Sequence, residues 1–115
     1  MSDCVFCKIV SGEIPSAKVY EDDTVLAFKD LEPQAPVHVL IIPKEHIASA
    51  AEITPENSGV VARIFEVAAK LSRELGLENG FRVVNNCGQD GMQSVRHLHF
   101  HMLGGKKMGW PPYAE

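Results

Sequence analysis

The chain has 115 residues, of which 45% are hydrophobic, and its formal net charge is -4. This length favours one compact domain, 1–115, and the acidic balance argues against a broad electrostatic grip on nucleic acid. We expect no membrane span, because no hydrophobic run is long enough, and the polar start "MSDC" is not typical of a signal peptide. Three cysteines with one Cys-x-x-Cys pair favour free thiols or a metal over disulfides, and hence the cytoplasm.

The first half of the chain predicts three strands. Residues 18–30, "KVYEDDTVLAFKD", are typical of a hairpin, because β-branched and aromatic residues flank a turn at Asp22 and Asp23. The proline-rich segment "DLEPQAP" predicts a loop. Residues 37–43, "VHVLIIP", then predict a buried strand.

One strong helix is predicted over "ITPENSGVVARIFEVAAKLSRELG". Thr54 suits the N-cap, Pro55 the first helical position, and Gly76 the C-terminal stop. The hydrophobic residues of this segment recur at helical spacing and predict a single buried face. They are Val60, Ile64, Val67, Ala68, Leu71 and Leu75.

The last third predicts two more strands and a tail. The strands are "FRVVN" and "HLHFHML", and the glycine-containing segment "NCGQDGMQS" between them predicts a loop. The tail, 108–115, contains the stiff segment "GWPPY". The order of elements predicts an α+β fold, an antiparallel sheet of about five strands with one main helix packed on it.

The stretch "QSVRHLHFHMLGG" places His97, His99 and His101 at every second position. In a strand these imidazoles share one face, and the hydrophobic residues between them line the other. His97 and His101 would lie about 13 Å apart at their backbones, too far for all three rings to bind one metal ion. Such a row suits three imidazoles that each act at a different point along one extended substrate. The alternative is three polar residues on a solvated sheet face.

The loop 86–94 before this row has the composition of an anion-binding loop. It offers small residues, backbone N–H groups and the Ser94 hydroxyl, although such glycine-containing segments are usually only turns. Joined to the histidines, it indicates phosphoryl or nucleotidyl transfer. Imidazole is a competent nucleophile at phosphorus, and a covalent intermediate divides one difficult displacement into two easier ones.

The histidine row followed by "MGWPP" resembles the histidine triad (HIT) superfamily, whose signature is His-x-His-x-His-x-x with hydrophobic x. "CVFCKIVSGEIPSAKVYEDD", "LAFKDLEPQAPVHVLIIPKEHI" and "RVVNN" resemble the nucleotide-binding branch, so the similarity extends over nearly the whole chain. The resemblance implies a single HIT domain and a homodimer that pairs through the helix and a sheet edge. It also implies hydrolysis of purine nucleoside 5'-phosphoramidates or of aminoacyl- and lysyl-adenylates.

The resemblance also implies catalytic roles. His99 would attack the α-phosphorus and form a nucleotidyl-histidine, which water then releases. His101 would contact the phosphate and protonate the leaving group, and His38 would help to relay protons. A backbone carbonyl on the far nitrogen of His99 would keep its attacking nitrogen unprotonated. No metal would be needed for catalysis, and a histidine bonded to backbone is the alternative for His38.

The nucleotide site implied by the resemblance includes Asp30, whose carboxylate can accept hydrogen bonds from two ribose hydroxyls. Asn86, Gln93 and Ser94 match the phosphate and ribose side. Trp110 would reach the partner's site in the dimer, and Met92 stands where related sequences often have glycine. The residues that would enclose the purine also fit plain core packing; they are Phe6, Ile9, Ile14, Phe28 and Leu31.

Cys4 and Cys7 have the spacing of half a tetrahedral zinc site. Because the other histidines are assigned to chemistry, His46 and His97 are left as further ligands, and some bacterial members of the family look similar in carrying zinc on two cysteines and two histidines. We therefore predict a closed, structural Zn²⁺ site of these four residues. The alternative is a pair of reduced core cysteines. Cys87 is expected to be a small buried side chain.

Two other functions fit parts of the pattern. One is a nucleotide-binding regulatory module with little turnover that acts through dimer contacts. The other is a dinucleoside polyphosphate hydrolase of a sister branch, which the short chain and the "WPP" tail disfavour. The intact set of His38, His97, His99 and His101 favours the enzyme, because a binding module needs no free imidazole at the phosphorus.

Overall fold

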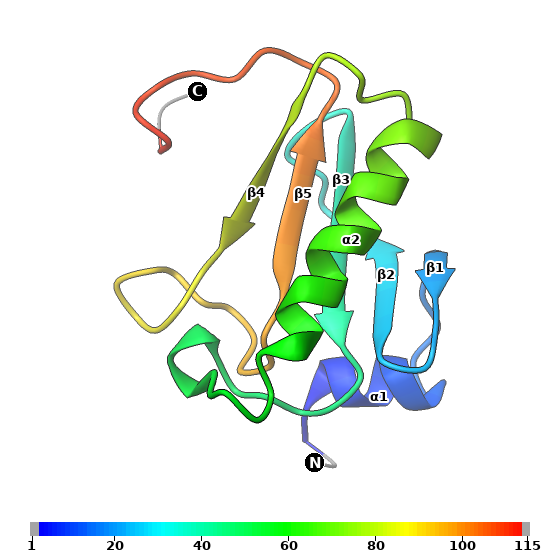
Figure 1. The fold of residues 1–115 in the computed structure, drawn as a ribbon, viewed down its shortest axis with the longest axis vertical. Helices are drawn as coiled ribbons and strands as arrows, with labels where there is room; N and C mark the ends of the chain where they lie inside the picture. The colour runs from blue at the N-terminus through cyan, green and yellow to red at the C-terminus, as the bar shows by residue number, and fades with distance from the viewer. Residues whose placement is uncertain (1–2, 114–115) are drawn as a thin grey trace.

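A computed structural model of the chain describes residues 3–113, so residues 114 and 115 of the predicted tail lie outside it. Five strands form one antiparallel sheet in the order β1-β2-β3-β5-β4 (Figure 1). The strands are β1 (Lys18–Glu21), β2 (Val25–Lys29), β3 (Val37–Pro43), β4 (Phe81–Asn85) and β5 (Phe100–Gly104). The helices are α1 (Val5–Ser11), the 3-10 helix η1 (Ala50–Glu52) and α2 (Gly59–Glu74). The predicted α+β class is confirmed.

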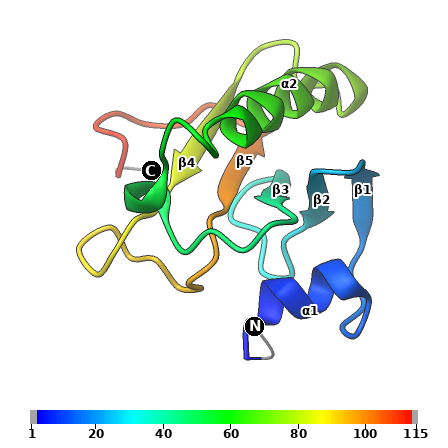
Figure 2. The same ribbon diagram turned by 60° about the horizontal axis from the view of Figure 1, so that its bottom comes forward.

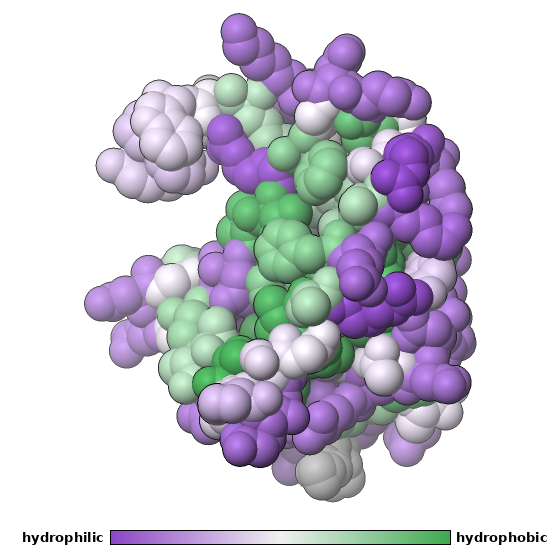
Figure 3. Space-filling model, in the orientation of Figure 1, coloured by the Kyte–Doolittle hydropathy of each residue, from purple (hydrophilic) through white to green (hydrophobic). Residues whose placement is uncertain are grey.

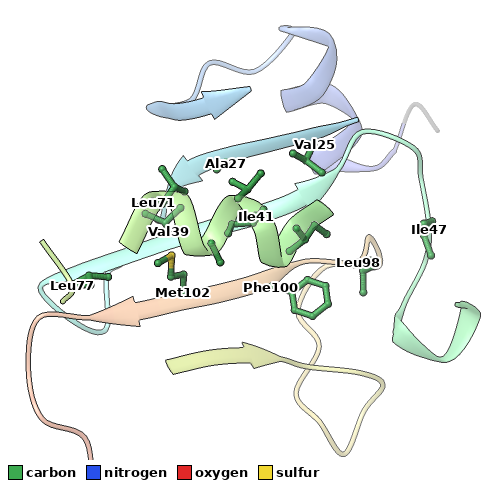
Figure 4. Packing of buried hydrophobic residues seen from close by; sticks show 13 residues of the cluster. Val25, Ala27, Val39, Ile41, Ile47, Leu71, Leu77, Leu98, Phe100 and Met102 are labelled. Atoms are coloured by element: carbon green, nitrogen blue, oxygen red, sulfur yellow. The ribbon is translucent and has the colours of Figure 1, made fainter. Parts of the chain in front are cut away.

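Helix α2 covers one face of the sheet with the side predicted from its spacing (Figure 4). Ile64, Val67 and Leu71 are each 1% exposed, and each such side chain contributes on the order of 1.5–3 kcal/mol by leaving water. They pack against Ile41 and Met102 of the sheet. Within the described residues, neither this helix nor any other has the length and hydrophobicity to cross a membrane.

The predicted start of this helix is wrong by one turn. Residues 55–58 form turns, and α2 begins at Gly59 rather than at Pro55. The Asn57 side chain accepts the Thr54 N–H at 2.7 Å and donates to the Glu52 carbonyl at 3.2 Å. These side-chain bonds satisfy backbone groups locally and compete with the helical pattern. Gly76, with φ of 75°, follows the C-cap as predicted.

The last strand is shorter than predicted, because the ladder begins at Phe100 and leaves His97 and His99 outside it. The part of β3 that would pair with residues before Phe100 ends at Pro43, which has no N–H to donate to the ladder. The Pro43 carbonyl instead accepts the His97 ring N–H at 2.8 Å. The alternation of faces persists, since Leu98, Phe100 and Met102 belong to the core beneath α2.

Helix α1 was not predicted, and it lies on the face of the sheet opposite α2 (Figure 2). The Cys4 sulfur caps it by accepting the Cys7 N–H, and Gly12 ends it at φ of 89°. Phe6 and Ile9 point into a second hydrophobic cluster. This cluster includes Leu26, Phe28, Leu40 and Ile42 of the sheet. The sheet is therefore buried on both faces at the β2 and β3 strands.

The described part of the tail, 108–113, is held at the edge strand β4. The Arg82 guanidinium donates to the Gly109 carbonyl at 2.8 Å and to the Pro112 carbonyl at 3.3 Å. The side chains of Trp110 and Tyr113 nevertheless are 80% and 90% exposed. The tail is thus anchored through its backbone and presents its aromatic rings outward.

Candidate functional site

A pocket of about 300 Å³ lies between α1 and the histidine-bearing face of the sheet. Most of the predicted nucleotide-binding residues line it: Phe6, Ile9, Ile14, Phe28, Asp30, Leu31, Ser94, His99 and His101. Five further lining residues were missed: Val5, Pro15, Ser16, Lys29 and Leu40. Several of these lie in loops or at strand ends, where the sequence has no periodic signal and only the fold brings them together.

Three predicted nucleotide-binding residues do not line this pocket within the described part of the chain: Asn86, Gln93 and Trp110. Asn86 donates its amide to a carbonyl inside the loop 86–94 at 2.6 Å. Gln93 donates to the Ala48 and Val95 carbonyls at 2.8 and 2.9 Å. Both amides therefore support the shape of the loop, and Trp110 stands on the exposed tail.

Loop 86–94 is tightly folded beside the pocket. A Cβ at Gly91 would lie 2.5 Å from the Cys87 carbonyl oxygen, so the chain closes on itself there. Met92 adopts φ of 62°, a left-handed value that is uncommon for a residue with a side chain. This geometry explains why glycine suits that position. Cys87 was predicted to be a buried side chain, and it is only partly buried.

His99 is held in one tautomer by a backbone carbonyl. Its Nδ1 lies 2.7 Å from the His97 carbonyl oxygen, which can only accept, so Nδ1 carries the proton. The Nε2 lone pair is then free, as a nucleophile requires. Phe6 packs edge-on against the ring, with centroids 5.0 Å apart, and the side chain is only 2% exposed.

His38 and His101 form a directed hydrogen bond. The Gln34 N–H donates to His38 Nδ1 at 3.0 Å, so the His38 proton is on Nε2 and points to His101 Nδ1 at 2.9 Å. His101 therefore carries its own proton on Nε2. Burial, with His99 and His38 nearby, lowers the pKa of His101 to about 4, and Asp30 opposes the shift. Burial also lowers the pKa of His38, and both rings are neutral at pH 7.

Asp30, His38 and His101 place one ligand atom each within 4.8 Å of one another. This spacing alone is compatible with a metal ion. However, His38 Nδ1 already accepts a backbone N–H, so its Nε2 keeps the proton that a metal ion would have to replace. Asp30 accepts the Glu32 N–H at 2.8 Å and lies 3.4 Å from His38 Nε2. The cluster is better described as a hydrogen-bonded chain.

A second cluster fits a metal ion well. The sulfur of Cys7 lies 3.3 Å from His46 Nδ1 and 3.6 Å from His97 Nδ1, and the Cys4 sulfur lies 3.4 Å from His97 Nδ1. Tetrahedral zinc with ordinary bond lengths requires a sulfur to nitrogen distance of about 3.5 Å. His97 Nε2 donates to the Pro43 carbonyl, which leaves Nδ1 unprotonated toward the sulfurs. These four residues are positioned to hold a metal ion, as predicted.

The two sites share His97. Its ring faces the cysteines, and its backbone carbonyl fixes the tautomer of His99. Helix α1 joins them as well, because Cys4 and Cys7 lie at its start while Phe6 and Ile9 line the pocket. The cysteine and histidine cluster and the pocket are therefore adjacent and share structural elements.

The sheet, the helix on one face and the histidine row on the other define the histidine triad class of α+β proteins. A family profile described as "Scavenger mRNA decapping enzyme C-term binding" matches residues 3–110. An uncharacterized HIT-like protein of Synechococcus elongatus is 46% identical over 110 residues, 96% of either chain. The chain belongs to the histidine triad (HIT) family.

Two further similarities bear on the two sites. A "14 kDa zinc-binding protein" of Brassica juncea is 46% identical over 96% of this chain and 99% of its own. The crystal structure of a HIT family hydrolase from Legionella pneumophila matches with a TM-score of 0.93 at 50% identity. That match covers 96% of this chain and 99% of the other.

Proposed function

We propose that the protein hydrolyses purine nucleoside 5'-phosphoramidates, or aminoacyl- and lysyl-adenylates, through a nucleotidyl-histidine intermediate. The observation that carries the proposal is the His99 ring, whose Nδ1 proton is bonded to the His97 carbonyl at 2.7 Å while the side chain lines the pocket. The hydrolase named among the similar structures supports the same class of reaction.

The distribution of hydrophobic and polar lining residues suggests one orientation for the nucleotide in the pocket. The hydrophobic walls formed by Phe6, Ile14 and Phe28 suit a purine base. Asp30 retains free lone pairs for the ribose hydroxyls, since a carboxylate offers about four acceptor sites. The phosphate then lies at the other end, beside Ser94 and the histidines.

The reaction proceeds in two balanced steps. His101 enters the first step as an imidazolium, because the anionic phosphate bound beside it favours the charged ring. His99 Nε2 bonds to the α-phosphorus while the bond from phosphorus to the leaving group breaks, and the leaving atom takes the Nε2 proton of His101, which becomes neutral. The positive charge then lies on the nucleotidyl-imidazolium of His99. In the second step water bonds to phosphorus as the bond from phosphorus to His99 Nε2 breaks, a proton of the water returns to His101, and the nucleoside monophosphate leaves with His99 neutral again. When His101 is neutral, His38 donates to its Nδ1 and holds its tautomer.

We propose Zn²⁺ as the occupant of the Cys4, Cys7, His46 and His97 site, in agreement with the name of the Brassica relative. Four protein ligands leave no open position for water, so the ion would stabilise the fold and take no part in the chemistry. Metal analysis of protein purified without chelator checks this assignment. About one zinc per chain is expected, and far less would contradict it.

We further propose a homodimer in the cytoplasm. Hydrophobic surface lies in a concave area beside the edge strand β4, between the tail and the loop after β4 (Figure 3). Phe65 on α2 and Phe81 on β4 are 48% and 40% exposed, which is unfavourable unless a partner covers them. A symmetric dimer through this area would carry Trp110 of each copy toward the other. The free cysteines fit a reducing compartment.

Rapid mixing with a labelled adenosine 5'-phosphoramidate tests the reaction. We expect protein quenched in alkaline denaturant, in which the bond from phosphorus to imidazole survives, to carry labelled AMP at early times, on a peptide that contains His99, before free AMP accumulates. Label on another residue would reject His99 as the nucleophile. Tight AMP binding with no hydrolysis and no trapped label would instead favour the regulatory module.

A further inference from the structure

One hydroxyl beside the pocket has no hydrogen-bond partner. Among the described side chains, Ser16 Oγ is the one buried nitrogen or oxygen atom without a partner. Buried polar groups are almost always bonded, and leaving one unsatisfied costs about 1–3 kcal/mol. Ser16 also lines the pocket. An unpartnered hydroxyl at a ligand site indicates a bond that forms only when the ligand is present.

The loop that carries Ser16 is fixed at both ends. The Ile14 N–H donates to the Lys8 carbonyl at 3.2 Å, which ties the loop to α1. The Lys29 N–H donates to the Ala17 carbonyl at 3.0 Å, which ties it to the end of β2. Because the backbone is held, Ser16 stays at the pocket, and one rotation about χ1 between staggered positions redirects its hydroxyl.

The sheet places Ser16 at the base end of the pocket. Ser16 precedes β1, while His99 precedes β5, and β2 and β3 lie between these strands. Three strand spacings of about 4.8 Å separate the two ends by roughly 14 Å. With the phosphate at His99 and the ribose at Asp30, the group that reaches Ser16 is the purine base.

We infer that Ser16 recognises the purine through a hydrogen bond from its hydroxyl to the polar edge of the base; this inference rests on the proposed function. A hydroxyl can donate one bond and accept two, so it matches either a ring nitrogen or an exocyclic amine. The hydrophobic lining residues, such as Ile9 and Ile14, can exclude water from the base but cannot fix its orientation by hydrogen bonds. Ser16 adds a hydroxyl at this end, where Lys29 also lines the pocket, and so can fix the orientation of the base.

The Ser16→Ala variant gives two effects of opposite sign. Calorimetric titration should show AMP binding about tenfold weaker, which corresponds to about 1.4 kcal/mol, with ribose 5-phosphate binding unchanged. Without ligand, the melting temperature should rise by about 2–5 °C, because the unsatisfied hydroxyl is gone. A serine that merely supports the fold would lower both stability and binding.

Ser11→Ala is the matched control. The Ser11 hydroxyl is exposed and already donates to the Lys8 carbonyl at 3.0 Å, so its removal should change neither measurement appreciably. Unchanged AMP affinity in Ser16→Ala, an equal loss for ribose 5-phosphate, or a lower melting temperature would each overturn the inference. A wild-type protein that binds AMP but does not cleave phosphoramidates would overturn the proposed hydrolase and leave the Ser16 comparison intact.

Discussion

Two backbone carbonyls determine which nitrogen of each buried histidine is available. The Pro43 carbonyl accepts a hydrogen bond from the Nε2–H of His97, which leaves Nδ1 unprotonated toward the cysteines. The His97 carbonyl accepts a hydrogen bond from the Nδ1–H of His99, which leaves Nε2 unprotonated in a ring that lines the pocket. Neighbouring histidines of one motif thus expose opposite nitrogens, which allows the proposed metal ligand and the proposed nucleophile to lie two residues apart.

The His99→Ala variant should lose nearly all turnover. Its covalent route is removed, while Asp30 and the hydrophobic walls remain, so AMP affinity should stay within a few-fold of wild type. The rate on a phosphoramidate should fall by three orders of magnitude or more, equivalent to roughly 4–5 kcal/mol of transition-state stabilisation. A variant that retained more than a tenth of wild-type activity would show that His99 is not the nucleophile.

His101 should make the protein less stable in acid. The folded pKa is lowered to about 4 by burial and by His99 and His38, against Asp30. The unfolded value is about 6.5, so the unfolded chain takes up the proton first. Above pH 6.5 the ring is neutral in both states, and His101 does not destabilise the folded protein. As the pH falls from 6.5 toward 4, the unfolded state gains the proton and the free energy of unfolding decreases. At pH 5 the loss is roughly 1–2 kcal/mol.

Urea unfolding at pH 7 and pH 5 measures this effect in wild type and His101→Asn. The free energy of unfolding should fall less in the variant between the two pH values. Acid effects on the metal site are common to both proteins and cancel in the comparison. Identical decreases would remove His101 as the source of the pH dependence.

At the scale of elements, α1 belongs to both sites. Its first turn presents two cysteines to the metal site, and its buried face presents Phe6 and Ile9 to the pocket. Packing and a sulfur cap hold a helix of only seven residues in place. A helix this short is marginal by itself, so its order depends on the groups it binds.

Removal of zinc should therefore weaken nucleotide binding. Thermodynamic linkage requires the effect to be reciprocal, and typical coupling energies of about 1–3 kcal/mol correspond to roughly 5- to 150-fold. We expect chelator-treated protein to bind AMP about tenfold more weakly, and AMP to slow zinc transfer to a chromophoric chelator. Chelation should also lower the melting temperature.

Cys87→Ser is the control for the coupling, since Cys87 lies outside the cluster of four ligands. It should retain both the zinc and the AMP affinity of wild type. Equal AMP affinities with and without zinc would contradict the coupling while leaving the structural role of the metal to the melting measurement.

The sequence predicted these elements unequally, for physical reasons. Strands β2 and β3 have continuous hydrophobic residues and were predicted closely, whereas β5 begins three residues later than predicted. Helix α1 has fewer than two turns, too few for a periodic signal, and the start of α2 was misplaced because Asn57 binds backbone in place of the helix. The metal ligands were predictable by residue type, whereas Ser16 was not, because its significance is the lack of a partner in the folded chain.

At the scale of the whole molecule, the sheet separates two hydrophobic clusters, one under α2 and one under α1. The tail belongs to neither cluster within the described residues. Arg82 holds it by two carbonyls at the edge strand. The fold is thus complete without the tail, although the proposed dimer site is not.

A chain that ends at Gly109 should unfold at nearly the same temperature as the full chain. Its activity on a phosphoramidate should fall several-fold, because Trp110 no longer reaches the partner copy. Thermal unfolding, sedimentation and hydrolysis rates measured on both proteins check this. Equal activity and unchanged substrate preference in a truncated dimer would contradict the role of the tail.

The position of β5 between β3 and β4 also orders events during synthesis. A nascent chain can pair β1, β2 and β3 as they emerge, but β4 has no neighbour in the sheet until residues 100–104 leave the ribosome. Contacts this distant in sequence form slowly, and an unpaired edge is prone to misassembly meanwhile. His97 and His99 emerge just before that strand. A ribosome that stalls before it therefore displays a hydrophobic half-sheet with neither site formed.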